Sequence, residues 1–347
     1  MKRLFARQST PPAIPAPRYD VQGADNELRW IADLAEAVRE TGDAAAAAEL
    51  IRLRHEVWQI GDYPQPPEPW PPAPPAAVAS TGIPTIRPGE LSAEKLHNAI
   101  SSRSCLLVPG LMSKRDADEL VAGTERALQA SQRLAAGDKG PDLDAWFLPF
   151  IPEGTKDQYS RARKWTTETG TVYAADSPRN FNRMVDICQS MGILDLLTDY
   201  FGVRPVMSVP KAAFKRVSPT GAPVGWHQDI HAYGEKTRAL NMWVALSSCG
   251  RDARGLGLVP INPGGVVEKL PPPPPLLSIS DETIDRLAAE GTPPVEPVFE
   301  KGDVLFFDTL LPHTTQQGDG FTRDRYALEC WFFAPTTVDE IWLPLQV

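Results

Sequence analysis

Apolar side chains recur at three- and four-residue spacing over residues 26–58, which predicts two consecutive amphipathic helices. Gly42 stands where the first helix should end, and Asp43 can cap a second helix over residues 44–58. Such a helical hairpin buries little apolar surface by itself. We therefore expect it to pack on the main domain or on a second subunit, and a homodimer formed through these helices is one expectation.

The middle of the chain mixes one short strand with helical patterns. An apolar run at residues 104–108 suits a first strand, and Ser113 can cap the helix that follows. Residues 180–200 carry a single long helical pattern that ends at Gly202. Residues 143–170 are rich in aromatic and charged side chains without a sustained period, and we interpret them as a lid-like insertion.

After Gly202 the pattern changes to short β-type runs separated by Gly, Pro and Asp. The predicted strands cover residues 206–217, 226–233, 238–247, 257–259, 297–299, 304–307 and 325–333. Helices first and many short strands afterwards favour a mainly β fold with flanking helices. We expect a double-stranded β-helix (a cupin-like jelly roll) with helices outside it, plus the N-terminal helical hairpin.

Proline marks the expected boundaries between these parts. The chain holds 36 prolines, and they cluster at residues 64–75 and 271–275. Proline-rich segments form extended, semi-rigid linkers. The sequence therefore predicts an N-terminal arm and hairpin at residues 1–60, a linker at 61–95, and the jelly-roll domain at 96–347.

Charge and cysteine content narrow the class of protein. The net charge of −9 gives no electrostatic reason for binding nucleic acid or an anionic membrane. The four cysteines lie far apart without zinc-type spacing, so each is expected to be a core residue in a reducing compartment. No apolar stretch approaches membrane-spanning length, and prolines interrupt the segment where a signal peptide needs an apolar run. We expect a cytoplasmic protein.

Candidate chemistry concentrates on three of the chain's acidic and imidazole side chains. The chain has five histidines, and His227 stands two residues before Asp229 on a predicted strand, which places both side chains on one face. His313 follows a later predicted strand and can supply a third ligand. Two histidines and one carboxylate leave open positions on a metal, which suits iron(II) oxygenases rather than a closed zinc site.

An arginine that follows these ligands can bind a carboxylate. Arg325 begins the last long predicted strand, and a guanidinium grips a carboxylate through two charge-assisted hydrogen bonds. Arg323 lies two residues earlier and would face the same side, so both remain candidates, with Arg325 favoured because it begins the apolar run. We therefore expect 2-oxoglutarate as the cosubstrate.

Several motifs in this order resemble the phytanoyl-CoA dioxygenase family of iron(II)/2-oxoglutarate oxygenases. They are His227-Gln228-Asp229-Ile230-His231, Trp243-Val244-Ala245-Leu246, Gly255 to Pro260, Gly302-Asp303 through His313, and Arg325. The resemblance covers roughly residues 100–335. It implies Fe(II), 2-oxoglutarate and O2 as cofactors and cosubstrates, with His227, Asp229 and His313 both catalytic and metal-binding.

The resemblance also implies roles for further residues. Trp243 would line the 2-oxoglutarate pocket, and Lys164 is the nearest match to a lysine that adds a second cosubstrate contact. Because related halogenases replace the carboxylate ligand, Asp229 favours hydroxylation, desaturation or cyclisation. The sequence departs from the family at Pro260-Ile261-Asn262-Pro263-Gly264-Gly265, where Pro-Gly-Ser-His is usual, which puts the substrate in doubt and leaves the iron site intact.

Other interpretations of the same residues remain open. His55 and His97 lie on helical segments and are expected to be structural, whereas His231 continues the alternation and can face the pocket. The leading hypothesis is an oxidoreductase that acts on a small-molecule or carrier-bound metabolite and releases succinate and CO2. The alternative is a non-catalytic binding or assembly module on the same jelly roll that has lost its metal-dependent activity.

Overall fold

The computed structural model describes residues 21–67, 82–221, 224–267, 278–290 and 293–347. The expected N-terminal arm up to residue 20, most of the first proline cluster and the whole second cluster lie outside the described residues.

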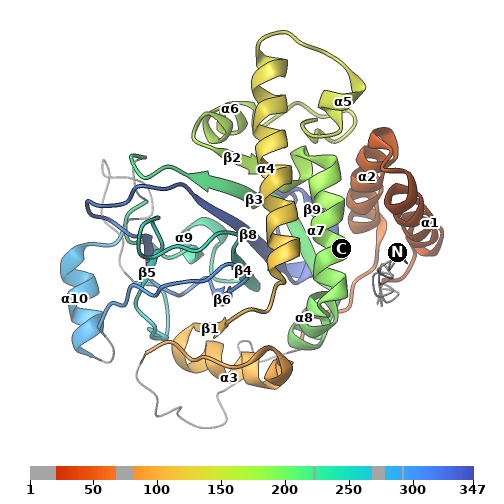
Figure 1. Cartoon of the computed structure of the whole chain (residues 1–347). Coiled ribbons are helices and arrows are strands. Elements are labelled where there is room, and N and C mark those ends of the chain that lie inside the picture. The colour runs from red at the N-terminus through yellow and green to blue at the C-terminus, as the bar shows by residue number, and fades with distance from the viewer. Residues whose placement is uncertain (1–20, 68–81, 222–223, 268–277, 291–292) are drawn as a thin grey trace, which may run out of the picture.

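The core is a seven-stranded antiparallel sheet in the order β1-β6-β4-β8-β3-β2, with β9 also paired to β3 (Figure 1). Its strands are β1 (Cys105–Val108), β2 (Thr171–Tyr173), β3 (Val206–Val217), β4 (Ala239–Ala245), β6 (Val304–Asp308), β8 (Arg325–Phe333) and β9 (Pro344–Gln346). Strands β2 and β9 share one edge of β3, where they pair with opposite ends of that strand. The register of β3 with β8 shifts between Met207 and Ala212, which marks a bulge.

One face of this sheet, the outer face, packs on helices. Alternate residues of β4, such as Met242 and Val244, join a core cluster with side chains from α3 (Ala93–Arg103), α7 (Pro178–Ser190) and α8 (Ile193–Phe201). Helix α4 (Lys114–Ala135) packs beside α7 on this face (Figure 1). The alternation of apolar residues along the strands therefore positions the helices.

The opposite face, the inner face, carries a second buried cluster and the polar side chains. Trp243 and Leu305 lie opposite each other on β4 and β6, and Trp331 belongs to the same cluster. Arg325 and Glu329 are two of the β8 residues that alternate onto this face, because Glu329 pairs directly with Trp243.

A small second sheet shares no strand pair with the main sheet. It consists of β5 (Leu256–Leu258) and β7 (His313–Thr315), and isolated bridges extend it. The helices α9 (Ile230–Tyr233) and α10 (Asp281–Ala289) lie on this side (Figure 1). The result is a core rich in antiparallel strands with flanking helices, consistent with a cupin-like fold.

The N-terminal helices α1 (Asp25–Thr41) and α2 (Ala44–Ile60) pack on each other, and α2 also packs on the body of the protein. Gly42 adopts φ 65° after α1, and the Asp43 side chain accepts a hydrogen bond from the Ala46 amide. His55 Nδ1 lies 2.8 Å from the Pro344 carbonyl oxygen on β9. The helices and the last strand are therefore held together.

Three predicted elements differ from the structure. The helix expected over residues 180–200 is two helices, α7 and α8, because Gly192 adopts φ 71° between them. The strands predicted at residues 226–233 and 297–299 are wrong, since the first contains isolated bridges at His227 and the one-turn helix α9, and the second contains a single isolated bridge at Phe299. Within the expected linker, whose bounds stay a prediction, Thr85 forms an isolated parallel bridge with Leu107 of β1.

The insertion at residues 143–170 is anchored by a buried arginine. It contains the end of α5 (Pro141–Asp144) and all of α6 (Ser160–Glu168). Arg163 Nε donates to Asp176 Oδ2 over 2.5 Å, and its Nη1 pairs with Asp157. The remaining short helices are η1 (Pro88–Glu90), η2 (Ala174–Asp176), η3 (Pro335–Thr337) and η4 (Glu340–Trp342).

One simple expectation is confirmed by the structure. All four cysteines are buried and free, as expected for core residues. No helix in the described part of the chain is both long enough and apolar enough to cross a membrane.

Candidate metal centre

His227, Asp229 and His313, called the metal triad below, converge on one point. Each offers a ligand atom, and these atoms all lie within 4.8 Å of one another. His313 Nε2 lies 3.5 Å from Asp229 Oδ2, and the two imidazole centroids are 4.1 Å apart. Two imidazoles and one carboxylate at this separation fit an iron(II) ion. Within the described residues this group contains no fourth ligand, so it does not match a closed zinc site.

A backbone pairing brings the two histidines together. The His227 amide donates to the His313 carbonyl oxygen, and the His313 amide donates to the His227 carbonyl oxygen, each over 3.0 Å. Asp229 lies in a turn with φ −71° and ψ −19° and begins the short helix α9. The carboxylate therefore reaches the histidines from a turn, and the strand alternation expected from the sequence is not what aligns it.

Each histidine of the triad is oriented by its own backbone. His227 Nδ1 lies 2.7 Å from the Gly225 carbonyl oxygen, and His313 Nδ1 lies 3.0 Å from the Leu311 carbonyl oxygen. A carbonyl oxygen accepts only from a protonated nitrogen, so both Nδ1 atoms carry the hydrogen. Both Nε2 atoms then present a lone pair for a metal.

Burial keeps His313 in the form that binds metal. His313 is only 8% exposed. Burial, together with the neighbouring His227, lowers the pKa of His313 to about 4. The imidazole is therefore neutral at neutral pH.

Gln228 ties the triad to its surroundings and was not predicted from the sequence. Its Nε2 donates to the Leu310 carbonyl oxygen over 2.6 Å, and its Oε1 accepts from the Val267 amide over 2.9 Å. The residue is fully buried. Its position between two ligands was the available signal, because a polar side chain that points away from the metal needs partners elsewhere.

Arg325 is a buried cation on the inner face. It is 3% exposed, its Nη1 donates to the Gly255 carbonyl oxygen over 2.9 Å, and its Nε has no hydrogen-bond partner. Among the described residues no carboxylate lies within ion-pair distance of it, and the guanidinium carbon lies 5.7 Å from the Trp243 ring centroid. A buried, unpaired guanidinium fits the carboxylate of 2-oxoglutarate.

The competing residues lie elsewhere. Arg323 is exposed and forms a bidentate pair with Asp252, with distances of 2.5 and 2.7 Å. Lys164 is 78% exposed on α6, and its ammonium lies 4.0 Å from Glu168 on the same helix. The structure therefore brings neither Arg323 nor Lys164 together with the metal triad, and the Lys164 expectation loses its geometric support.

The other three histidines are not part of the triad. His55 is buried against β9, and His97 stacks on Tyr200 with ring centroids 4.2 Å apart. His231 lies on α9, so a helical turn replaces the alternation that would have aligned it with the two ligands.

The inner face also carries an acidic group that the sequence did not single out. Glu329 pairs with Lys215 across β8 and β3. Burial acts to raise the pKa of Glu329, but the Lys215 ammonium outweighs burial and holds the pKa at about 2. Glu329 is therefore charged at neutral pH.

Comparison with known proteins places these features in a family. The model of the phytanoyl-CoA dioxygenase (PhyH) family matches residues 106–323, which include the metal triad. Arg325 lies two residues beyond this match. No curated protein matches the chain.

Several solved structures are similar to this chain at low sequence identity. EctD from S. alaskensis, solved with 2-oxoglutarate and 5-hydroxyectoine, has a TM-score of 0.50 at 16% identity, covering 80% of this chain and 86% of EctD. AviO1 from Streptomyces viridochromogenes Tue57 has a TM-score of 0.43 at 16% identity, covering 72% and 98%. The non-heme alpha ketoglutarate dependent epimerase SnoN has a TM-score of 0.43 at 17% identity, covering 69% and 81%.

Proposed function

Because this chain belongs to the phytanoyl-CoA dioxygenase (PhyH) family, we propose that it hydroxylates a small-molecule or carrier-bound metabolite with release of succinate and CO2. Family membership makes the protein an oxidoreductase and confirms the expectation of iron, 2-oxoglutarate and O2. The observation that carries the proposal is the convergence of the metal triad, in a structure whose inner face also holds the buried Arg325 with no ion-pair partner among the described residues.

Each residue has a defined task in this proposal. His227, Asp229 and His313 hold the iron through two Nε2 atoms and a carboxylate oxygen. Iron and 2-oxoglutarate, when bound, supply the oxidising chemistry with O2. Arg325 binds the distal carboxylate of 2-oxoglutarate, and Trp243 forms the wall beside that guanidinium.

The fold would keep the site dry. We assign the main sheet and the smaller β5–β7 sheet to the two layers of a double-stranded β-helix, with the triad between them. His313 begins β7, and Arg325 begins β8, so each layer contributes to the site. Burial of Arg325 strengthens its attraction for a carboxylate, because little water competes.

Asp229 bears on the type of reaction. A carboxylate ligand occupies the position that a halide would need, so hydroxylation, desaturation or cyclisation is favoured over halogenation. We propose hydroxylation as the simplest of these outcomes.

A spectroscopic titration tests the proposal. Anaerobic addition of Fe(II) and 2-oxoglutarate should give a weak visible charge-transfer band, and admission of O2 should form succinate. His227→Ala and Asp229→Ala should abolish the band, while His97→Gln, a histidine outside the site, should retain it. Absence of both band and succinate at saturating iron would contradict the proposal.

The alternative of a non-catalytic module makes the opposite prediction for metal. It requires that chelation changes neither ligand binding nor stability, although the triad and its orienting hydrogen bonds are complete. A metal that binds this group would stabilise the folded chain by mass action. An unchanged melting temperature with and without metal would favour the alternative.

Three further expectations stay predictions. The domain division at residues 60 and 95 is one, although Ile51 of α2 lies in the main core cluster and links the hairpin to the body. A homodimer through the N-terminal helices is the second. A cytoplasmic location is the third, which four buried free thiols would suit.

A further inference from the structure

Strand β3 places an unpaired lysine on the inner face. Lys211 lies two residues before Ala213, which pairs with Glu329. Strand alternation therefore places the Lys211 side chain on the inner face, as it does that of Ala213. Glu329 forms its ion pair with the neighbouring Lys215, and it also attracts the Lys211 ammonium from beyond ion-pair distance. Among the described residues no carboxylate lies within ion-pair distance of Lys211.

Two aromatic rings hold the Lys211 ammonium in place. Its nitrogen lies 4.8 Å from the Tyr233 ring centroid and 5.3 Å from the Trp342 ring centroid. These two rings are themselves in contact, with centroids 5.4 Å apart. Aromatic faces attract the cation without supplying an oxygen acceptor, so its N–H donors remain available.

Two buried donors without partners belong to Tyr233 and to its ring neighbour Trp331. The Tyr233 hydroxyl and the Trp331 indole nitrogen have no hydrogen-bond partner in the described part of the chain. Tyr233 is 8% exposed and Trp331 is fully buried, and their ring centroids are 5.1 Å apart. A buried polar group without a hydrogen-bond partner lowers the stability of the fold. A bound ligand that supplies the missing acceptor would remove this cost.

The group of Lys211, Tyr233, Trp331 and Trp342, called the Lys211 site below, is connected to the metal triad. The Tyr233 amide donates to the Asp229 carbonyl oxygen over 3.3 Å across the single turn of α9. On the other side Trp331 contacts Phe307, which in turn contacts His313 with centroids 4.9 Å apart. The Lys211 site is therefore joined to the triad through α9 on one side and through Phe307 on the other.

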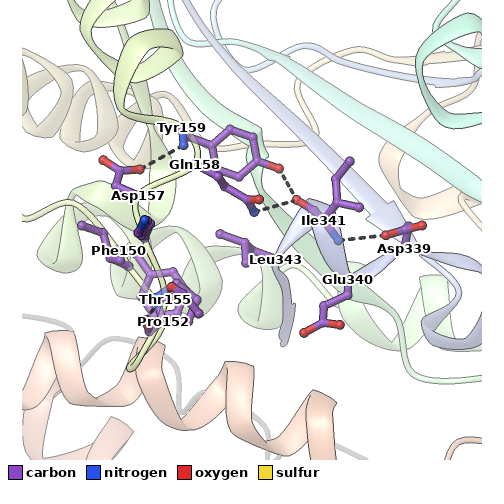
Figure 2. Close-up of a pocket in the computed structure, with 12 residues that line it drawn as sticks. Phe150, Pro152, Thr155, Asp157, Gln158, Tyr159, Asp339, Glu340, Ile341 and Leu343 are labelled. Atoms are coloured by element: carbon purple, nitrogen blue, oxygen red, sulfur yellow. Dashed lines mark hydrogen bonds between the residues drawn. The ribbon is translucent and has the colours of Figure 1, made fainter.

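Hydrogen bonds to its backbone hold the segment that carries Trp342. Figure 2 shows Gln158 and Tyr159 both donating to the Ile341 carbonyl oxygen, at the wall of a separate cavity of about 460 Å³. The Ser208 hydroxyl donates to the Trp342 carbonyl oxygen over 2.8 Å. Trp342 is thus held in a fixed position facing Lys211.

We propose that the Lys211 site binds the acid group of the substrate, so that the metabolite oxidised at the triad is a small organic acid. The inference rests on the proposed function. A cation and two neutral donors select an oxyanion over a cationic or purely apolar ligand.

Matched pairs of acids and amides test this proposal. The full-length chain, loaded with Mn(II) and 2-oxoglutarate, is titrated with phenylacetate, indole-3-acetate and hexanoate and with the corresponding amides, followed by tryptophan fluorescence and calorimetry. At least one acid should bind about tenfold or more tightly than its amide, as a charge-assisted hydrogen bond requires. Lys211→Met should abolish this preference and Lys211→Arg should retain it.

Controls separate this inference from the proposed function. Lys236→Met alters an exposed lysine after α9 and should leave the preference unchanged. The affinities for Mn(II) and 2-oxoglutarate should stay unchanged in Lys211→Met. If the wild-type chain fails to bind Mn(II) and 2-oxoglutarate, the proposed function fails, and the metal-free titration still tests the Lys211 site. The inference is overturned if no acid exceeds its amide, if Lys211→Met keeps the preference, or if that variant loses 2-oxoglutarate instead.

Discussion

His227 and His313 exchange two backbone hydrogen bonds of 3.0 Å, one in each direction. This isolated antiparallel bridge joins the segment before α9 to the start of β7. The backbone pairing therefore places the two imidazoles side by side. Their Nδ1 hydrogen bonds then orient both Nε2 atoms toward the metal position. The metal triad thus depends on the segments that keep this bridge in register.

Gln228→Ala should weaken metal binding without removing a ligand. The substitution leaves the Leu310 carbonyl and the Val267 amide without their partner, which costs about 1–3 kcal/mol for each buried group. Loss of such an orienting residue lowers metal affinity by roughly 10–100-fold. Calorimetry with Mn(II) and urea unfolding measure both effects. Gln158→Ala, which removes an exposed glutamine on the far side of the Trp342 segment, is the control, and equal metal affinities in both variants would contradict this role.

Arg325→Met should lower 2-oxoglutarate affinity by roughly 10–100-fold, because it removes charge-assisted hydrogen bonds worth about 1.5–3 kcal/mol. Arg323→Met should change the affinity little, since its exposed pair with Asp252 is worth about 0–1 kcal/mol. Lys164→Met should also leave it unchanged. Calorimetry with the Mn(II)-loaded chain measures all three. A loss in Arg323→Met alone would move the anchor to that residue.

Mild acid should loosen the docking of α2 on β9. Burial lowers the pKa of His55 from its ordinary value, so the folded chain resists a proton that the unfolded chain accepts. The stability contributed by neutral His55 is fully present above a pH of about 6.5 and is lost as the pH falls below the lowered folded-state pKa. The free energy of unfolding of the wild type minus that of His55→Gln should therefore fall from pH 7 to pH 5. A flat difference would contradict the assignment.

Trp30→Glu should convert a dimer into a monomer if the N-terminal helices form the subunit contact. Trp30 is 58% exposed on α1, and it lines an open groove with Leu34 and Leu53. A carboxylate there would be buried without a partner in a dimer. Light scattering coupled to size-exclusion chromatography measures the mass. A wild-type mass equal to that of one chain would remove the homodimer prediction.

Much of the fold could be predicted from local pattern. Strands β3 and β8 begin and end where the apolar runs do, and Asp43 and Ser113 cap the helices as their positions indicate. These features depend on neighbouring residues alone, which a single sequence contains. The short strands β2 and β9 escaped prediction, because three residues carry too little pattern and their pairing with β3 is non-local.

The metal triad was identified for a reason that is partly wrong. The pair His227 and Asp229 was predicted from strand alternation, whereas a bridge followed by a turn aligns them. Residue types and order were enough to find the ligands, but the path of the backbone between them depends on distant contacts such as that of Gln228 with Leu310. Lys164 was assigned from order alone, and its exposure on α6 could not be read from the sequence.

Crystals grown with Mn(II) and 2-oxoglutarate test the central claim most directly, through anomalous diffraction at the manganese edge. The account predicts one strong peak within bonding distance of His227 Nε2, His313 Nε2 and an Asp229 carboxylate oxygen, with the distal carboxylate of 2-oxoglutarate on Arg325. A chain that binds Mn(II) only at other residues, or that shows no peak at a saturating concentration, would contradict it.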